Sequence, residues 1–71
     1  MDVNEIRKQL RIRPFKPLEI HLDNGDRYLV THPEVVVTDS IVVAVDEQGE
    51  AIYMAPEAIS AIKLAKVKLR E

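Results

Sequence analysis

The chain has no cysteine and only two glycines among its 71 residues. Without thiols it can form neither disulfides nor thiolate metal sites. Gly25 and Gly49 stand too far apart in the sequence to form a glycine-rich phosphate loop. A chain of this length seldom buries enough apolar surface to be stable alone, and usually depends on disulfides, a metal or oligomerisation. We therefore expect self-association to stabilise this fold.

Long apolar runs and aromatic residues are also scarce. No stretch approaches the roughly 18 apolar residues of a membrane span, and the N-terminal residues lack the apolar segment of a signal peptide. We therefore expect a cytoplasmic protein without a membrane partner. We also expect one domain over residues 1–71, with a helix and connector at 1–13, barrel strands at 18–64 and a tail at 65–71.

The charges are unevenly distributed, with basic ends and an acidic centre. The formal net charge of −2 argues against an indiscriminate nucleic-acid binder, because phosphate neutralisation requires clustered cations. Solvated faces with ordinary charges explain both ends most simply. The alternative is an RNA-binding surface, whose candidate residues are Arg7, Lys8, Arg11, Lys63, Lys66 and Lys68.

The first residues predict a short helix from Val3 to Arg11. Asp2 and Glu5 have the spacing of a helix-capping pair, and Val3, Ile6 and Leu10 form one narrow apolar stripe. About nine residues make a helix too short to be stable alone, so this stripe is expected to dock on a sheet.

Leu18 to Val30 reads as a β-hairpin, because two alternating apolar runs meet at Asn24-Gly25. A two-residue loop would mix polar and apolar side chains on one face. A turn with Gly25 as a left-handed bulge instead pairs Ile20 with Tyr28 and Leu18 with Val30, which keeps the apolar side chains together.

Further short strands are expected after this hairpin. The β-branched runs 35–37 and 41–45 are separated by Thr38-Asp39-Ser40 and form either two strands or one bent strand, and runs 51–54 and 59–64 follow. Gly49 is the expected positive-φ residue of the turn between 45 and 51. The prediction is a mainly β fold, in which a short N-terminal helix precedes a five-stranded SH3-like or Sm-like small barrel.

Residues that could perform chemistry are few. His21, Asp23 and His32 are close in sequence, but strand geometry does not bring two imidazoles to one ion. Ser40 and Ser60 lack the context of a catalytic nucleophile. We expect a protein that is not an enzyme, with no metal and no cofactor.

Two segments resemble the conserved blocks of the Sm-like family, including its Hfq-type members: the turn Leu22-Asp23-Asn24-Gly25 and the stretch Tyr53 to Ser60. This resemblance implies a ring-forming homo-oligomer that binds RNA on its faces or pore. An SH3-like relative without rings fits the same order of elements. The segments Arg13 to Pro17 and Gly25 to Glu34 are also similar to those of a class of short uncharacterised bacterial proteins. This second resemblance brings no known activity with it.

The leading hypothesis is a homo-oligomeric binding or scaffolding module of unknown ligand. Its subunits are expected to join by edge-to-edge strand addition through 41–45 and 52–54, with 59–64 as the other edge. One alternative is a ring that binds single-stranded RNA, and another is a regulatory subunit that docks on a protein partner. The expected interface residues are Ile41, Val43, Val45, Ile52, Met54, Ile59 and Ile62.

Overall fold

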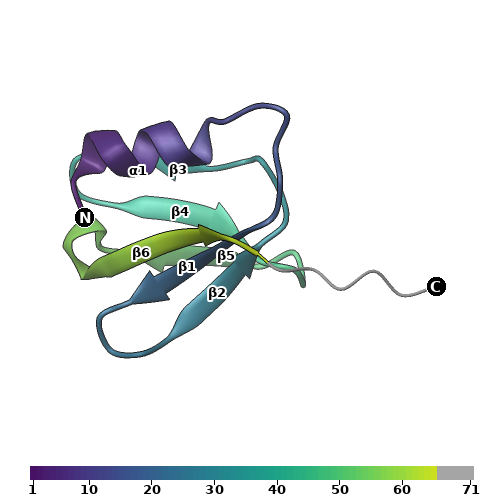
Figure 1. The fold of residues 1–71 in the computed structure, drawn as a ribbon. Helices are drawn as coiled ribbons and strands as arrows, with labels where there is room; N and C mark the ends of the chain where they lie inside the picture. The colour runs from purple at the N-terminus through teal and green to yellow at the C-terminus, as the bar shows by residue number, and fades with distance from the viewer. Residues whose placement is uncertain (66–71) are drawn as a thin grey trace.

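The computed structural model describes residues 1–65, and shows a mainly β fold with one short N-terminal helix and two small antiparallel sheets (Figure 1). None of its helices within those residues has the length and apolarity to cross a membrane. The predicted tail lies outside the described residues from position 66 onward. The elements are α1 (Val3–Leu10), β1 (Leu18–Leu22), β2 (Arg27–Val30), β3 (Val36–Val37), β4 (Val42–Val45), β5 (Ala51–Met54), the 3-10 turn η1 (Pro56–Ala58) and β6 (Ile59–Leu64).

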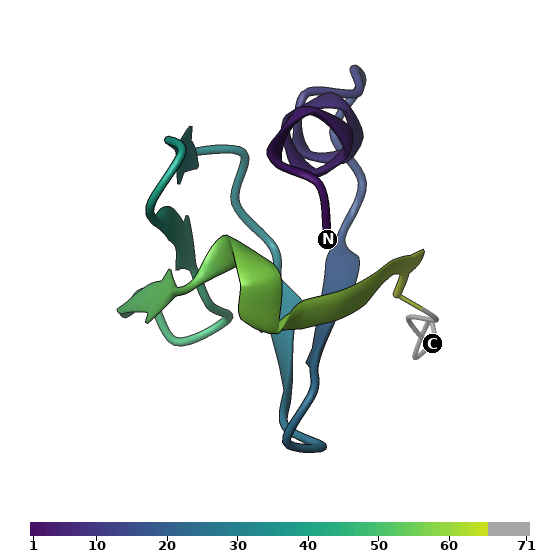
Figure 2. The same ribbon diagram turned by 90° about the vertical axis from the view of Figure 1, so that its left-hand side faces the viewer.

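Helix α1 lies across one end of the two sheets, where Figure 2 shows it nearly end-on. Ile6 and Leu10 from its apolar stripe have no exposed surface, which confirms the predicted docking face. The amino group of Met1 donates to the carbonyls of Pro56 and Ile59 at 3.1 and 2.9 Å, and so fastens the start of the helix to η1 and β6.

The side chain of Asp2 accepts a hydrogen bond from the amide of Glu5 at 3.3 Å, as the capping pattern predicted. This bond pairs an amide that has no partner within the helix. We expect Asp2→Ala to lower the free energy of unfolding by about 1 kcal/mol, because the amide then depends on water. Urea denaturation measures the difference, and Asp2→Asn, which keeps an acceptor oxygen, should recover most of it. Equal losses in both variants would contradict a capping role.

The first sheet has the strand order β2-β1-β6. Leu18 pairs with Val30 and Ile20 with Tyr28, so the predicted hairpin register is confirmed. Gly25 has φ +94°, and the amide of Leu22 donates to the carbonyl of Asp26 at 2.8 Å, as the predicted bulge requires. On the other side of β1, Leu18 pairs with Leu64 and Ile20 with Ile62 of β6.

The second sheet has the order β3-β4-β5. The prediction of five strands was wrong, because the part of the chain that the structure describes has six. Thr38 decides the count. Its hydroxyl oxygen accepts from the amides of Ser40 and Ile41 at 3.2 and 3.0 Å, which closes a tight turn. The turn folds β3 back onto β4 as a separate antiparallel strand, where a bent strand would have continued in one direction. Gly49, with φ +82°, confirms the predicted turn residue between β4 and β5.

The two sheets do not close into a barrel, so the closed form of the predicted barrel is corrected. Within residues 1–65 a single bridge, from Val30 to Asp46, connects β2 to the end of β4. Turn η1 redirects the chain after β5, so β6 pairs with β1 rather than with β5. The core between the sheets and α1 consists of Ile6, Leu10, Leu18, Ile20, Val30, Val42, Ala44, Met54 and Ile59.

Candidate interaction surface

The second sheet presents an apolar face to water. Val36, Val43 and Tyr53 stand side by side on β3, β4 and β5, because Val36 pairs with Val43 and Val43 with Tyr53. Val36 is 55% exposed and Tyr53 69% exposed. We call this surface the apolar outer face, and it consists of Val36, Ile41, Val43, Val45, Ala51 and Tyr53.

The apolar outer face exists because the strands of the second sheet carry apolar side chains on both sides of the sheet. On β4, Val42 and Ala44 are buried in the core, and Val43 and Val45 on the opposite side are only half-buried. None of the ten residues of β3, β4 and β5 carries a charge. A sheet with one solvated face normally alternates apolar and polar side chains, so this second apolar face is a candidate surface for contact with another protein chain.

The outer face of the first sheet is different, because its side chains are mostly polar or charged. Glu19 faces Leu29 on one side and Lys63 on the other, and His21 faces Arg27. This is the alternation expected of a face that stays in water. The apolar outer face of the second sheet is therefore a property of that sheet and not of the whole molecule.

The structure divides the seven predicted interface residues by face. Ile41, Val43 and Val45 are half-buried and belong to the apolar outer face. Met54 and Ile59 lie in the core of the single chain, and Ile52 and Ile62 pack against that core. Val36 and Tyr53 also belong to the apolar outer face and were not among the seven named residues, although Tyr53 lies in the expected segment 52–54 and alternates with Ile52 and Met54.

The central position of β4 corrects the expected mode of association. Strand β4 is hydrogen-bonded to β3 on one side and β5 on the other, so residues 42–45 cannot add a strand from a second subunit. Strand β5 is an edge of the second sheet, and β6 is an edge of the first. Strand β4 could therefore contact a second subunit only through its side chains on the apolar outer face.

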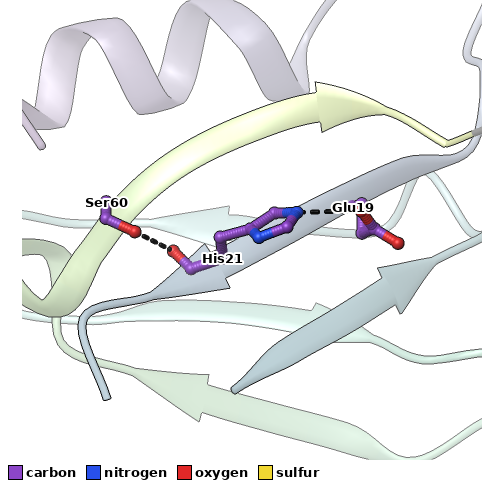
Figure 3. A network of polar contacts seen from close by, with 3 residues as sticks. All are labelled: Glu19, His21 and Ser60. Carbon is purple, nitrogen blue, oxygen red and sulfur yellow. Dashed lines mark hydrogen bonds and ion pairs between the residues drawn. The ribbon is translucent and has the colours of Figure 1, made fainter. Parts of the chain in front are cut away.

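Glu19, His21 and Ser60 form a polar contact network on the first sheet (Figure 3). The imidazole Nε2 of His21 lies 2.8 Å from Oε1 of Glu19, and the hydroxyl of Ser60 donates to the main-chain carbonyl of His21 at 3.1 Å. The pairing of β1 with β6 shifts register here, since His21 pairs with Ala61 and Leu22 with Ile59. Ser60 is the extra residue of this bulge. Its hydroxyl donates to the carbonyl of His21 at the point where the regular strand pairing is interrupted. Because that hydroxyl donates to the main chain and not to the imidazole, the trio holds the bulge and does not form a nucleophile–base pair.

The remaining candidate groups do not gather into one site. Within the described residues, no three His, Asp or Glu side chains are placed to share a metal ion. The guanidinium of Arg7 donates to Oδ1 of Asn4 at 3.0 Å and to the carbonyl of Val37 at 3.2 Å, so it fastens α1 to β3. Lys8, Arg11 and Lys63 are exposed. Lys66 and Lys68 lie outside the described residues.

Comparison with protein-family models, with curated proteins and with solved structures gives no match to this chain. The surfaces described above are therefore the basis on which its function is inferred.

Proposed function

We propose that the protein is a non-catalytic binding or scaffolding module that associates with further copies of itself through the apolar outer face. The observation that carries this proposal is the uncharged row of Val36, Val43 and Tyr53 across the second sheet. We assign the fold to the SH3-like or Sm-like small barrels in a partly open form. The helix, the two sheets and the short turn before β6 support this assignment.

A second copy of the chain is favoured as the partner for two reasons. First, the apolar outer face carries no charge, so two identical faces meet without leaving an unpaired charge buried. Second, the core formed by residues 1–65 contains only nine buried side chains, none of which is aromatic. Burial of further apolar surface between copies supplies the stabilisation that a chain of this length otherwise lacks.

An interface of standard size would take up a modest share of the surface of this chain. A standard protein–protein interface removes about 800 Å² of surface from each partner, which is about a sixth of the 5049 Å² of this chain. Face-to-face packing of identical sheets relates two subunits by a two-fold axis and gives a dimer. Pairing of the β5 edge with the β6 edge of a neighbour would instead repeat around a ring.

Val43→Lys is expected to disperse the assembly. The substitution places a charge at the centre of the apolar outer face, where a partner would bury it without a counterion. Native mass spectrometry and sedimentation velocity measure the subunit number. We expect an oligomer for the unsubstituted protein and a monomer for Val43→Lys at the same concentration.

Leu29→Lys is the matched control, since Leu29 is a half-buried apolar residue on the outer face of the other sheet. It should leave the subunit number unchanged. Tyr53→Ser provides a milder second test, because this side chain is 69% exposed in the single chain and its loss does not open the core. A monomeric unsubstituted protein, or a Val43→Lys variant of unchanged mass, would contradict the proposal.

A further inference from the structure

An apolar groove of about 370 Å³ opens between the connector after α1 and the inner face of the first sheet. Its floor is formed by Leu18, Ile62 and Leu64, which are neighbours because Leu18 pairs with Leu64 and Ile20 with Ile62. Ile12, Phe15 and Lys16 contribute to its wall. The volume lies within the range of roughly 300 to 1,000 Å³ that is usual for ligand pockets.

The groove contains apolar side chains that the fold leaves in water. Among the described residues, the exposed large hydrophobic side chains are Ile12, Val36, Tyr53 and Leu64, and they divide between two places. Val36 and Tyr53 belong to the apolar outer face. Ile12 and Leu64, at 55% and 65% exposed, both line the groove. The two surfaces share no residue, so a ligand of the groove is independent of the self-association proposed above.

The charge around the groove indicates the character of its ligand. Within residues 1–65 its lining includes Lys16 and no acidic side chain. Arg11 and Arg13 flank Ile12, and the guanidinium of Arg13 donates to the carbonyls of Leu10 and Ile12 at 3.4 and 3.0 Å. Cations beside an apolar floor complement a ligand that combines apolar groups with carboxylates.

The adjoining strand indicates the form of the ligand. Strand β6 supplies Ile62 and Leu64 to the floor, and it is an edge of the first sheet. An extended peptide that adds to such an edge gains main-chain hydrogen bonds and places alternate side chains on the inner side of the sheet. Nucleobases bind by stacking on aromatic rings, and Phe15 is the single aromatic residue of the lining. The otherwise aliphatic lining therefore suits leucine or valine side chains better than nucleobases.

From the groove, its cations and its edge strand we infer that the protein binds an extended peptide segment of a partner protein, in which aliphatic residues alternate with acidic ones. The aliphatic side chains occupy the floor over Leu18, Ile62 and Leu64. The carboxylates between them point to the opposite face of the sheet, where the exposed Lys63 of β6 lies.

Fluorescence anisotropy of labelled six-residue peptides tests this inference with the full chain. The probe alternates aspartate and leucine, and its counterpart alternates lysine and leucine. We expect the acidic probe to bind at least about tenfold more tightly than the basic one at low salt, with the difference shrinking in 1 M salt. Leu64→Glu should weaken the acidic probe by about tenfold, because it places a carboxylate on the floor of the groove.

The variants are chosen so that the fold is retained. Leu64 and Lys63 are exposed, so their substitution leaves the core intact. Lys63→Glu is expected to weaken the probe by about fivefold, because Lys63 lies on the face to which the carboxylates point. Its matched control is Arg27→Glu, an equal charge change at an exposed site on β2, which should leave affinity unchanged. Val43→Lys should also bind the probe with unchanged affinity, which separates this test from that of self-association.

Three results would overturn the inference. The first is equal affinity of Leu64→Glu and the unsubstituted protein for the acidic probe. The second is displacement of the probe by a uridine oligonucleotide that binds more tightly, which would make RNA the ligand. The third is a tenfold gain in affinity in the double variant Val67→Ser/Leu69→Ser, which would make residues of the chain itself the occupant of the groove.

Discussion

Replacement of Ile20 with alanine is expected to lower the free energy of unfolding by about 2 to 5 kcal/mol. Ile20 has no exposed surface and lies on β1, the central strand of the first sheet. It pairs with Tyr28 on one side and with Ile62 on the other, so both neighbouring strands fix the backbone around the cavity. Because small domains are stable by only about 5 to 15 kcal/mol, the loss removes a large share of the total.

Urea denaturation at a fixed protein concentration measures this effect, since association shifts apparent stability by mass action. Ile12→Ala is the matched control, because the same side chain is 55% exposed at that position. We expect its free energy of unfolding to change by no more than about 0.5 kcal/mol. If Ile20→Ala loses no more stability than Ile12→Ala, the core does not lie where the structure places it.

Gly25→Ala is expected to lower the free energy of unfolding by about 1 to 2 kcal/mol through backbone strain alone. Gly25 has φ +94°, and a Cβ atom built there has no neighbour within 4 Å. No steric clash therefore adds to the effect. The strain falls on the turn that sets the register of the hairpin, in which the amide of Gly25 donates to the carbonyl of Leu22 at 3.0 Å.

Gly25→Asn separates strain from other effects of a side chain. Asparagine tolerates positive φ better than alanine does, so this variant should be the more stable of the two, although its side chain is larger. Thermal unfolding followed by circular dichroism ranks the three proteins. A Gly25→Ala variant as stable as the unsubstituted protein would show that the turn adopts another conformation in solution.

The features that could be predicted from the sequence are those that short segments determine. The hairpin register followed from the requirement that Leu18, Ile20, Tyr28 and Val30 share one face, which a single bulge at Gly25 satisfies. The docking face of α1 followed from the spacing of Ile6 and Leu10. In each case about ten neighbouring residues contain the whole pattern.

The number of strands depended on the hydrogen bonds of one side chain, which the sequence alone does not reveal. Thr38 could have continued a bent strand or closed a turn, and its hydroxyl closes the turn by accepting two amides. The sequence does not show which residues of 51–54 face the core, because every residue of this run is apolar or aromatic. Only the pairing with β4 shows that Met54 faces the core and Tyr53 faces water.

The groove was absent from the sequence-based prediction because its lining comes from distant parts of the chain. Ile12 and Phe15 lie before the first strand, and Ile62 and Leu64 belong to the last one. No local pattern relates the two segments. They meet because the bulge at Ser60 and turn η1 direct β6 alongside β1.

The pairing of the first strand with the last one has a consequence for synthesis on the ribosome. Strands β1 and β2 can form their hairpin early, but an isolated two-stranded hairpin is marginally stable, and the second edge of β1 has no partner until β6 emerges. The hydrogen bond from the amino group of Met1 to the carbonyl of Ile59, 58 positions away, likewise cannot form before Ile59 has been synthesised. Contacts so distant in sequence slow folding. The nascent chain therefore exposes an open strand edge beside Leu18 and Ile20 until β6 has been synthesised, which is when a chaperone would protect it most effectively from aggregation.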